Sequence, residues 1–216
     1  TEKFMFDGER LIQHIIKQRY FEEEISNEVN LSYSDNQVTV TTDYLTLVYT
    51  LNSEGYASQC VYSLSSQNRI YQFSYSAEGY LTGIVENIDN REYSSTSLTY
   101  ENGDITSISS KMNGLENKFI YEPGEESSTY HLPCLGLLEI HPLTFHIEAL
   151  YAGLLGKDPR HFTIRSCPAG SNDEKTVYSY GFDKKGNPSR MICQTTYAGG
   201  QASYYPYTRN ISISFE

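Results

Sequence analysis

The chain has 216 residues, a formal net charge of −11 and a pI of about 4.9. A surface this acidic repels polyphosphates, so we expect no nucleic acid among its partners. No apolar run approaches the roughly 20 residues that a membrane-spanning helix needs. Charged residues make up only 20% of the chain, and its 20 tyrosines occur without a tryptophan. This composition suits strands with one buried face and one uncharged polar face.

The beginning of the chain favours an exported protein. It starts at Thr1 and shows no charged-then-apolar leader, as expected for a mature or trimmed form whose targeting segment has been removed. The small fraction of charged residues and the abundance of Ser, Thr and Tyr also favour an exported protein.

A short corner recurs along the chain, first in FDGERL and most completely in residues 73–87, FSYSAEGYLTGIVEN. An aromatic entry leads to a polar turn with Gly or Asn, which tolerate positive φ, and an apolar exit follows. The predicted turn residues are Gly8, Asn36, Gly55, Gly79, Gly103, Gly124 and Gly186. From Gly8 to Gly124 they follow one another after 28, 19, 24, 24 and 21 residues, about the length of two strands and two turns.

The segments between the corners alternate as strands do. Tyr71, Phe73 and Tyr75 share one face of a predicted strand, and residues 178–182 and 211–215 repeat the pattern. The pattern predicts an all-β fold in which residues 1–216 form a single domain of β-hairpin repeats. Because a large antiparallel meander twists, we expect a curled or barrel-like sheet.

One segment, about 131–168, interrupts the repeats and is predicted to be a helical insertion. Within it PLTFHIEALYAGLLGK predicts a helix from about 142 to 156, with Pro142 in the first turn and Gly156 just past the end. This helix is apolar on nearly every face, which is typical of a buried helix. We therefore expect it to pack on the concave side of the sheet.

The insertion also gathers candidate metal ligands. A zinc site would need three or four of them to converge, yet no two histidines have i,i+4 spacing. We interpret them as structural side chains and expect no metal or other cofactor. The weak candidates are His131, Cys134, His141, His146 and His161.

The cysteines Cys60, Cys134, Cys167 and Cys193 have no CxxC spacing. They allow either two disulfides or four small buried side chains, and a chain of this length favours the second. The sequence also contains no GxSxG or HExxH motif. We therefore identify no catalytic residues and expect no enzymatic activity.

The corners, the stretch ALYAGLLGKDPRHFTIRS and the last hairpin YSYGFDKKGNPSRM together resemble a family of exported gut-bacterial proteins. This family is catalogued as domain of unknown function 4595 and described as porin-like in fold. The resemblance implies export, through a lipid-anchored precursor, to the periplasm or the cell surface, and it supplies no catalytic residues. The strands of this chain alternate apolar residues with Ser, Thr, Gln and Glu, so we expect apolar residues inside and a soluble domain.

Three functional hypotheses follow. The first is a non-enzymatic, exported binding or interaction scaffold at a bacterial envelope, with an unidentified protein, glycan or lipid ligand. The second is a carrier of an apolar ligand such as a lipid inside the curled sheet. The third is an envelope hydrolase, which would need carboxylates or a Ser–His pair to meet in one cleft.

Overall fold

The chain folds as one continuous sheet of hairpins. A computed structural model describes residues 2–20, 23–64, 67–127, 137, 140–171, 173–182, 184, 188–196, 207–210 and 214–215. Within these residues β1 to β15 follow one another in chain order as antiparallel neighbours, and β16 adds to β1 in parallel. The strands are β1 (Glu2–Asp7), β2 (Arg10–Tyr20), β3 (Glu23–Ser34), β4 (Gln37–Thr41), β5 (Thr46–Leu51), β6 (Ala57–Leu64), β7 (Gln67–Tyr75), β8 (Leu81–Ile88), β9 (Arg91–Glu101), β10 (Asp104–Met112), β11 (Leu115–Ser127), β12 (His161–Pro168), β13 (Lys175–Phe182), β14 (Pro188–Thr196), β15 (Tyr207–Asn210) and β16 (Ser214–Phe215).

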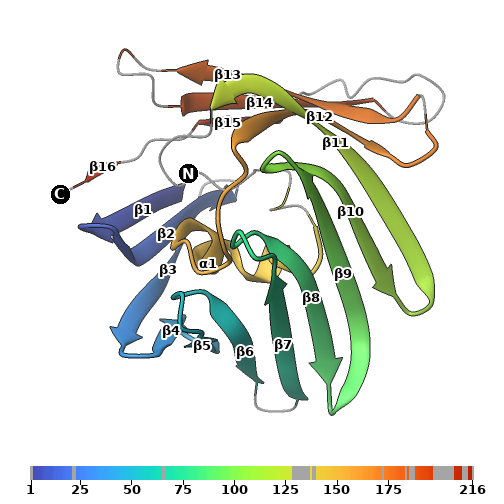
Figure 1. The fold of residues 1–216 in the computed structure, drawn as a ribbon. Coiled ribbons are helices and arrows are strands. Elements are labelled where there is room, and N and C mark those ends of the chain that lie inside the picture. The colour runs from blue at the N-terminus through green and yellow to red at the C-terminus, as the bar shows by residue number, and fades with distance from the viewer. Residues whose placement is uncertain are drawn as a thin grey trace.

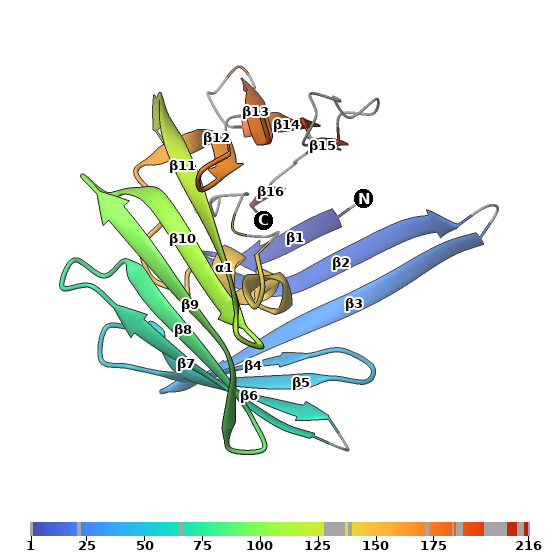
Figure 2. The same cartoon turned by 90° about the vertical axis from the view of Figure 1, so that its right-hand side faces the viewer.

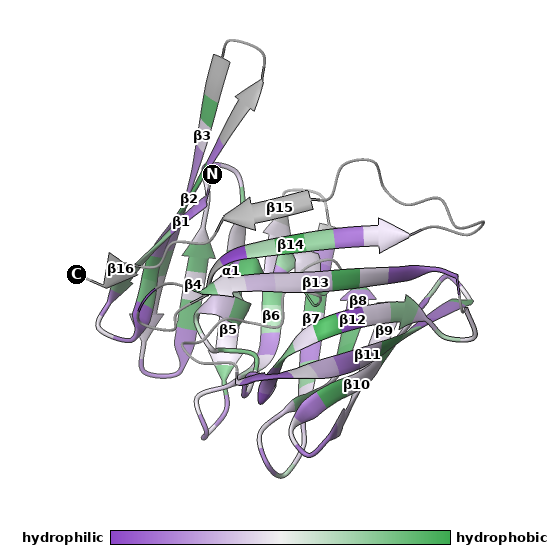
Figure 3. Ribbon diagram, turned by 90° about the horizontal axis from the view of Figure 1, so that it is seen from above, coloured by the Kyte–Doolittle hydropathy of each residue, from purple (hydrophilic) through white to green (hydrophobic). Residues whose placement is uncertain are grey.

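The sheet curls around the insertion between β11 and β12 (Figures 1 and 2). Its two ends are β15 and β16, and in the described part of the chain no pairing joins them into a closed barrel. Hydrophobic and hydrophilic residues alternate along the strands (Figure 3), because successive side chains of a strand point to opposite faces. The predicted fold, a curled antiparallel meander with one helix on its concave side, is confirmed.

The helix is shorter than predicted. A 3-10 turn, Leu143–Phe145, leads into α1 (Ile147–Tyr151). The amide of Gly153 donates to the carbonyl of Leu150 at 3.1 Å, and that of Leu154 donates to Ala149 at 2.9 Å. With Gly153 at φ +68°, this is the Schellman pattern that closes a helix. Gly153, and not Gly156, is therefore the glycine that closes the helix.

Beyond the helix, residues 154–160 form a strap along the rim of the sheet. Tyr75, at the end of β7, donates a hydrogen bond to the carbonyl of Ala57 at 2.6 Å and reaches that of Leu154 at 3.4 Å. Three backbone hydrogen bonds join the strap to successive hairpins: the amide of Ala57 donates to the carbonyl of Leu154 at 2.7 Å, the amide of Lys157 to that of Gly79 at 2.9 Å, and the amide of Arg160 to that of Gly103 at 3.0 Å. The strap therefore ties these hairpins together.

Two sequence boundaries need correction. Residues 161–168 form β12 and do not belong to the predicted insertion, so the sheet resumes at His161. Alternation is hidden there because Phe162 and Thr163 are both buried, next to a shift in the β11–β12 register. Gly124, predicted to lie in a turn, lies inside β11. A Cβ there would approach Cγ2 of Ile164 to 2.6 Å, so Gly124 permits close contact with β12.

The other predicted corners that the structure describes fall between strands. Gly8, Gly55, Gly79 and Gly103 have positive φ, from +59° to +91°. Asn36 lies in the turn between β3 and β4 but is not among the residues with positive φ. Gly186 lies outside the described residues.

The buried side chains of the helix belong to the same hydrophobic core as those of the strands. Ala149, Leu150 and Tyr151 are buried, and the ring of Tyr151 stacks on Phe4 of β1 with centroids 3.8 Å apart. No helix in the described residues has the length and apolar character needed to cross a membrane.

Because of the strap, alanine should cost different amounts of stability at two glycines that have similar backbone geometry. Gly156 has φ +89° and Gly55 has φ +85°, so alanine at either site carries the left-handed penalty of about 1–2 kcal/mol. At Gly156 the new Cβ would also lie 2.6 Å from the carbonyl oxygen of Gly79, whereas at Gly55 nothing lies within 4 Å. We expect Gly156→Ala to lower the free energy of unfolding by about 1–3 kcal/mol more than Gly55→Ala does. Urea denaturation measures both losses, and equal losses would show that the strap does not hold the rim.

Candidate functional site

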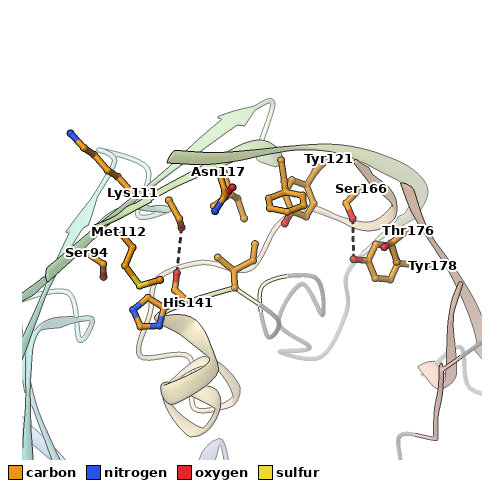
Figure 4. A pocket seen from close by; sticks show the side chains of 13 residues that line it. Ser94, Lys111, Met112, Asn117, Tyr121, His141, Ser166, Thr176 and Tyr178 are labelled. Atoms are coloured by element: carbon orange, nitrogen blue, oxygen red, sulfur yellow. Dashed lines mark hydrogen bonds between the residues drawn. The ribbon is translucent and has the colours of Figure 1, made fainter. Parts of the chain in front are cut away.

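The concave side of the sheet is filled at one end and hollow at the other. Beyond the helix an open hollow of about 250 Å³ lies over the inner faces of β9 to β13 (Figure 4). Its lining is mostly apolar, with small hydroxyl and amide groups between the apolar side chains. The apolar lining residues are Ile108, Met112, Phe119, Tyr121, Ile140 and Tyr178, and the polar ones are Ser94, Ser110, Lys111, Asn117, His141, Ser166 and Thr176.

A second hollow, of about 280 Å³, continues the first toward β14 and shares Phe119, Ser166 and Thr176 with it. We call the two together the side groove. It crosses the junction of β12 and β13, which pair only through Arg165 with Val177 and Ser166 with Thr176. Under this junction the hydroxyls of Ser166 and Tyr178 lie 3.1 Å apart (Figure 4).

A row of facing residues leads from beneath the helix to the side groove. Each member lies opposite the next in the register of adjacent strands, so all point to the concave side. We call it the inner row: Tyr49, Cys60, Tyr71, Glu86, Ser94 and Met112, on β5 to β10. Its first four members are entirely buried, and Ser94 and Met112 line the groove.

Glu86 is the charged member of this row and is held by three partners. Its Oε2 accepts hydrogen bonds from Ser94 at 2.7 Å and from Nε2 of His141 at 2.6 Å, and its Oε1 lies 3.1 Å from the Arg69 guanidinium. Burial alone would raise the pKa of Glu86, but the hydrogen bonds from His141 and Ser94 and the nearby charges outweigh it and lower the pKa. The carboxylate is therefore ionised at neutral pH.

His146, just before the helix, is entirely buried. Its Nδ1 hydrogen-bonds with the Tyr49 hydroxyl at 2.7 Å, and its ring meets those of Tyr71 and Phe73 edge to face. No described residue hydrogen-bonds to its Nε2. Burial lowers the pKa of His146 to about 3, so the side chain is a neutral structural group.

The three metal candidates that the structure describes do not converge. His141 pairs with Glu86, His146 with Tyr49, and Nδ1 of His161 with Asp104 at 2.8 Å. His131 and Cys134 lie outside the described residues. Within the described residues no three His, Cys, Asp or Glu side chains gather as metal ligands.

Sequence reasoning missed His14 and Glu86. His14 of β2 bonds through Nδ1 to Glu148 of the helix at 2.7 Å, a contact 134 residues apart in sequence that no local pattern reveals. Glu86 did leave a signal. It occupies the inward phase of β8 between Ile84 and Ile88, where a charged residue in an apolar alternation marks a buried ion pair.

Two hydroxyls at the groove have hydrogen-bond partners within the protein. Ser94 donates to Glu86, and Ser110 donates to the backbone carbonyl of His141 at 3.3 Å. Cys60 and Cys167 form no disulfide, as the sequence favoured, and Cys60 is buried while Cys167 is half-buried. Cys134 lies outside the described residues. Burial raises the pKa of Cys60 to about 12, so this thiol is not a thiolate at neutral pH.

Comparison with known proteins agrees with this fold. A family model described as a domain of unknown function (DUF4595) with porin-like fold matches residues 6–190, and the chain belongs to this family. A crystal structure of a porin-like protein from Bacteroides uniformis is similar to this chain, with a TM-score of 0.85 and 27% sequence identity. The match covers 96% of this chain and 86% of that one. No curated protein matches the chain.

The buried His146 predicts how stability depends on pH. In the unfolded chain its pKa returns to the ordinary value of 6.5, whereas in the folded protein it is about 3. Between these values the unfolded state binds a proton that the folded state does not. The free energy of unfolding therefore falls as pH drops below about 6.5, by up to about 1.4 kcal/mol per pH unit.

The control is His146→Gln, which keeps a hydrogen-bond acceptor for Tyr49 but does not titrate. Urea denaturation measures the free energy of unfolding at each pH. Between pH 7 and pH 5 this free energy should fall less steeply for the variant than for the unchanged protein. The lowered pKa of Glu86 places its own contribution at lower pH, so it does not obscure the comparison. An identical pH dependence of the two free energies of unfolding would contradict the conclusion that His146 is neutral in the folded protein.

Proposed function

We propose that this protein is a non-enzymatic, exported binding protein whose ligand lies in the side groove. The observation that carries the proposal is the hollow of about 250 Å³ on the concave side, lined by apolar rings and chains with hydroxyl and amide groups among them. Small-molecule sites have this form: a mostly apolar concave surface with a few placed polar groups. The fixed carboxylate of Glu86, beneath His141, gives the groove one rigid polar end.

The second hypothesis, a carrier of an apolar ligand, is supported in a modified form. An enclosed ligand would need the space that Leu150, Tyr151 and Leu154 occupy, and these side chains are buried in the core. The side groove is open, so an apolar chain bound there keeps one side near solvent. We therefore place the ligand of a carrier in the groove as well.

Export to the periplasm or the cell surface, through a lipid-anchored precursor, is part of the proposal. It is supported by the small fraction of charged residues, by the high content of Ser, Thr and Tyr, and by the family resemblance. Fractionation of the native bacterium with an antibody to this chain tests it. We expect the protein in the envelope fraction, and recovery with the cytosol would refute this part.

Two neighbouring positions on β11 provide a matched test of the groove. Asn117 lines the hollow and Lys118 follows it, and both are exposed. Because neighbours in a strand point to opposite faces, tryptophan at 117 fills the groove and tryptophan at 118 lies outside it. With Nile red as a neutral fluorescent probe, we expect Asn117→Trp to weaken binding at least about tenfold, which corresponds to about 1.4 kcal/mol. Lys118→Trp should leave binding unchanged.

Fluorescence titration gives the affinities, and native mass spectrometry gives the stoichiometry. Equal binding by all three proteins, or no binding by the unchanged protein, would refute the groove as the ligand site. Turnover of any member of a broad ester, glycoside and peptide panel would refute the non-enzymatic assignment.

A further inference from the structure

We propose that His141 is the specificity residue of the side groove and that it accepts a hydrogen bond from a hydroxyl group of a neutral amphiphile. This inference rests on the proposed function, and it adds the chemical class of the ligand. Three observations support it: the position of the proton on His141, the charges that face the groove, and the residues that line the groove.

The Glu86 carboxylate fixes the proton on the His141 ring. An ionised carboxylate only accepts hydrogen bonds, so the 2.6 Å contact places the proton of His141 on Nε2. The Glu86 carboxylate also lies 3.1 Å from the Arg69 guanidinium. In a neutral imidazole with its proton on Nε2, Nδ1 is the ring nitrogen with a free lone pair.

This nitrogen is available to a ligand. His141 lines the hollow, and its side chain is 31% exposed. Its ring is steadied on two sides by edge contacts with Tyr93 and Phe145. No hydrogen bond from the described residues reaches Nδ1, and this atom is not buried. The groove therefore presents a fixed acceptor at the Glu86 end.

The charges around the groove disfavour an anion. Of the described residues that line the hollow, Lys111 alone carries a cationic side chain, and this side chain points away from the hollow (Figure 4). The chain as a whole carries a formal charge of −11. Lys175 lines the second hollow, beside Glu174. An anionic head group at His141 would therefore meet no cation that points into the first hollow, and the acidic surface would repel it.

The rest of the lining suits a hydroxylated head with an apolar tail. Ser110 lies beside His141, and Ser166 and Thr176 lie farther along, where the two hollows join. Ile108, Phe119 and Tyr121 supply apolar surface between these groups. A sugar head at His141, with an alkyl chain running toward β13, uses both kinds of surface.

The test compares two probes with the same tail, n-octyl β-D-glucoside and n-octyl sulfate, each below its micelle concentration at pH 7.5. Calorimetric titration should show tighter binding of the glucoside to the unchanged protein. We expect His141→Leu to weaken glucoside binding about tenfold, the scale of one hydrogen bond. Lys118→Leu, the matched control on the opposite face of β11, should leave glucoside binding unchanged. Thermal unfolding confirms that each variant is folded.

A second measurement does not depend on the probes. Spectra of the ¹⁵N-labelled histidine side chains report which ring nitrogen is protonated. We expect His141 in its Nε2–H form in the unchanged protein. In Glu86→Gln the amide can donate to Nε2, so the proton should move to Nδ1 and the preference for glucoside over sulfate should fall. An Nδ1–H form in the unchanged protein would overturn the inference.

The outcomes separate this inference from the proposed function. If octyl sulfate binds as tightly as the glucoside, or if His141→Leu has no effect while Asn117→Trp still blocks Nile red, the ligand class is wrong and the groove remains the site. If neither amphiphile nor Nile red binds, the proposed function fails and this inference fails with it.

Discussion

The arrangement of the sheet depends on a match of spacing between the strap and the hairpins. Neighbouring strands lie about 4.8 Å apart, so successive hairpin corners on one rim are separated by two strands, or about 9.6 Å. Three residues of chain reach at most about 10 Å. The strap uses this step: its positions 154, 157 and 160 hydrogen-bond with residues 57, 79 and 103 of successive hairpins. A repeat of about two dozen residues in the sheet is thereby held by a three-residue step in the strap.

The tyrosines of the corners serve the same rim. The rings of Tyr56 and Tyr75 lie 5.3 Å apart, and those of Tyr80 and Tyr100 lie 4.9 Å apart. Each pair joins the residue after one turn to the strand that ends beside the next turn. A Cβ on Gly103 would come within 2.7 Å of the Tyr80 hydroxyl. Glycine at that corner is thus needed for its backbone conformation and for the tyrosine that covers it.

The sequence predicted those features that recur or that depend on neighbouring residues. The hairpin meander followed from alternating strands such as Tyr71 to Tyr75, and the buried helix followed from a segment that is apolar on every face. The end of the helix was misplaced because Gly153 and Gly156 both suit a helix end, and only the hydrogen bonds to Ala149 and Leu150 distinguish them. The pairs His14–Glu148 and His141–Glu86 were beyond sequence reasoning, because their partners lie 134 and 55 residues apart and meet only after the sheet has curled.

The position of the helix relates to that of the candidate site. Ile140 and His141, just before the 3-10 turn, line the hollow over β9 to β13, so the groove lies at the N-terminal end of the helical segment. The helix itself packs on the early strands, through Tyr151 on Phe4 and Glu148 on His14. Because the inner row runs from beneath the helix to this hollow, the buried Glu86 that pairs with the insertion also fixes the proton of the histidine at the groove. The same carboxylate therefore joins the insertion to the sheet and sets the hydrogen-bonding character of the site.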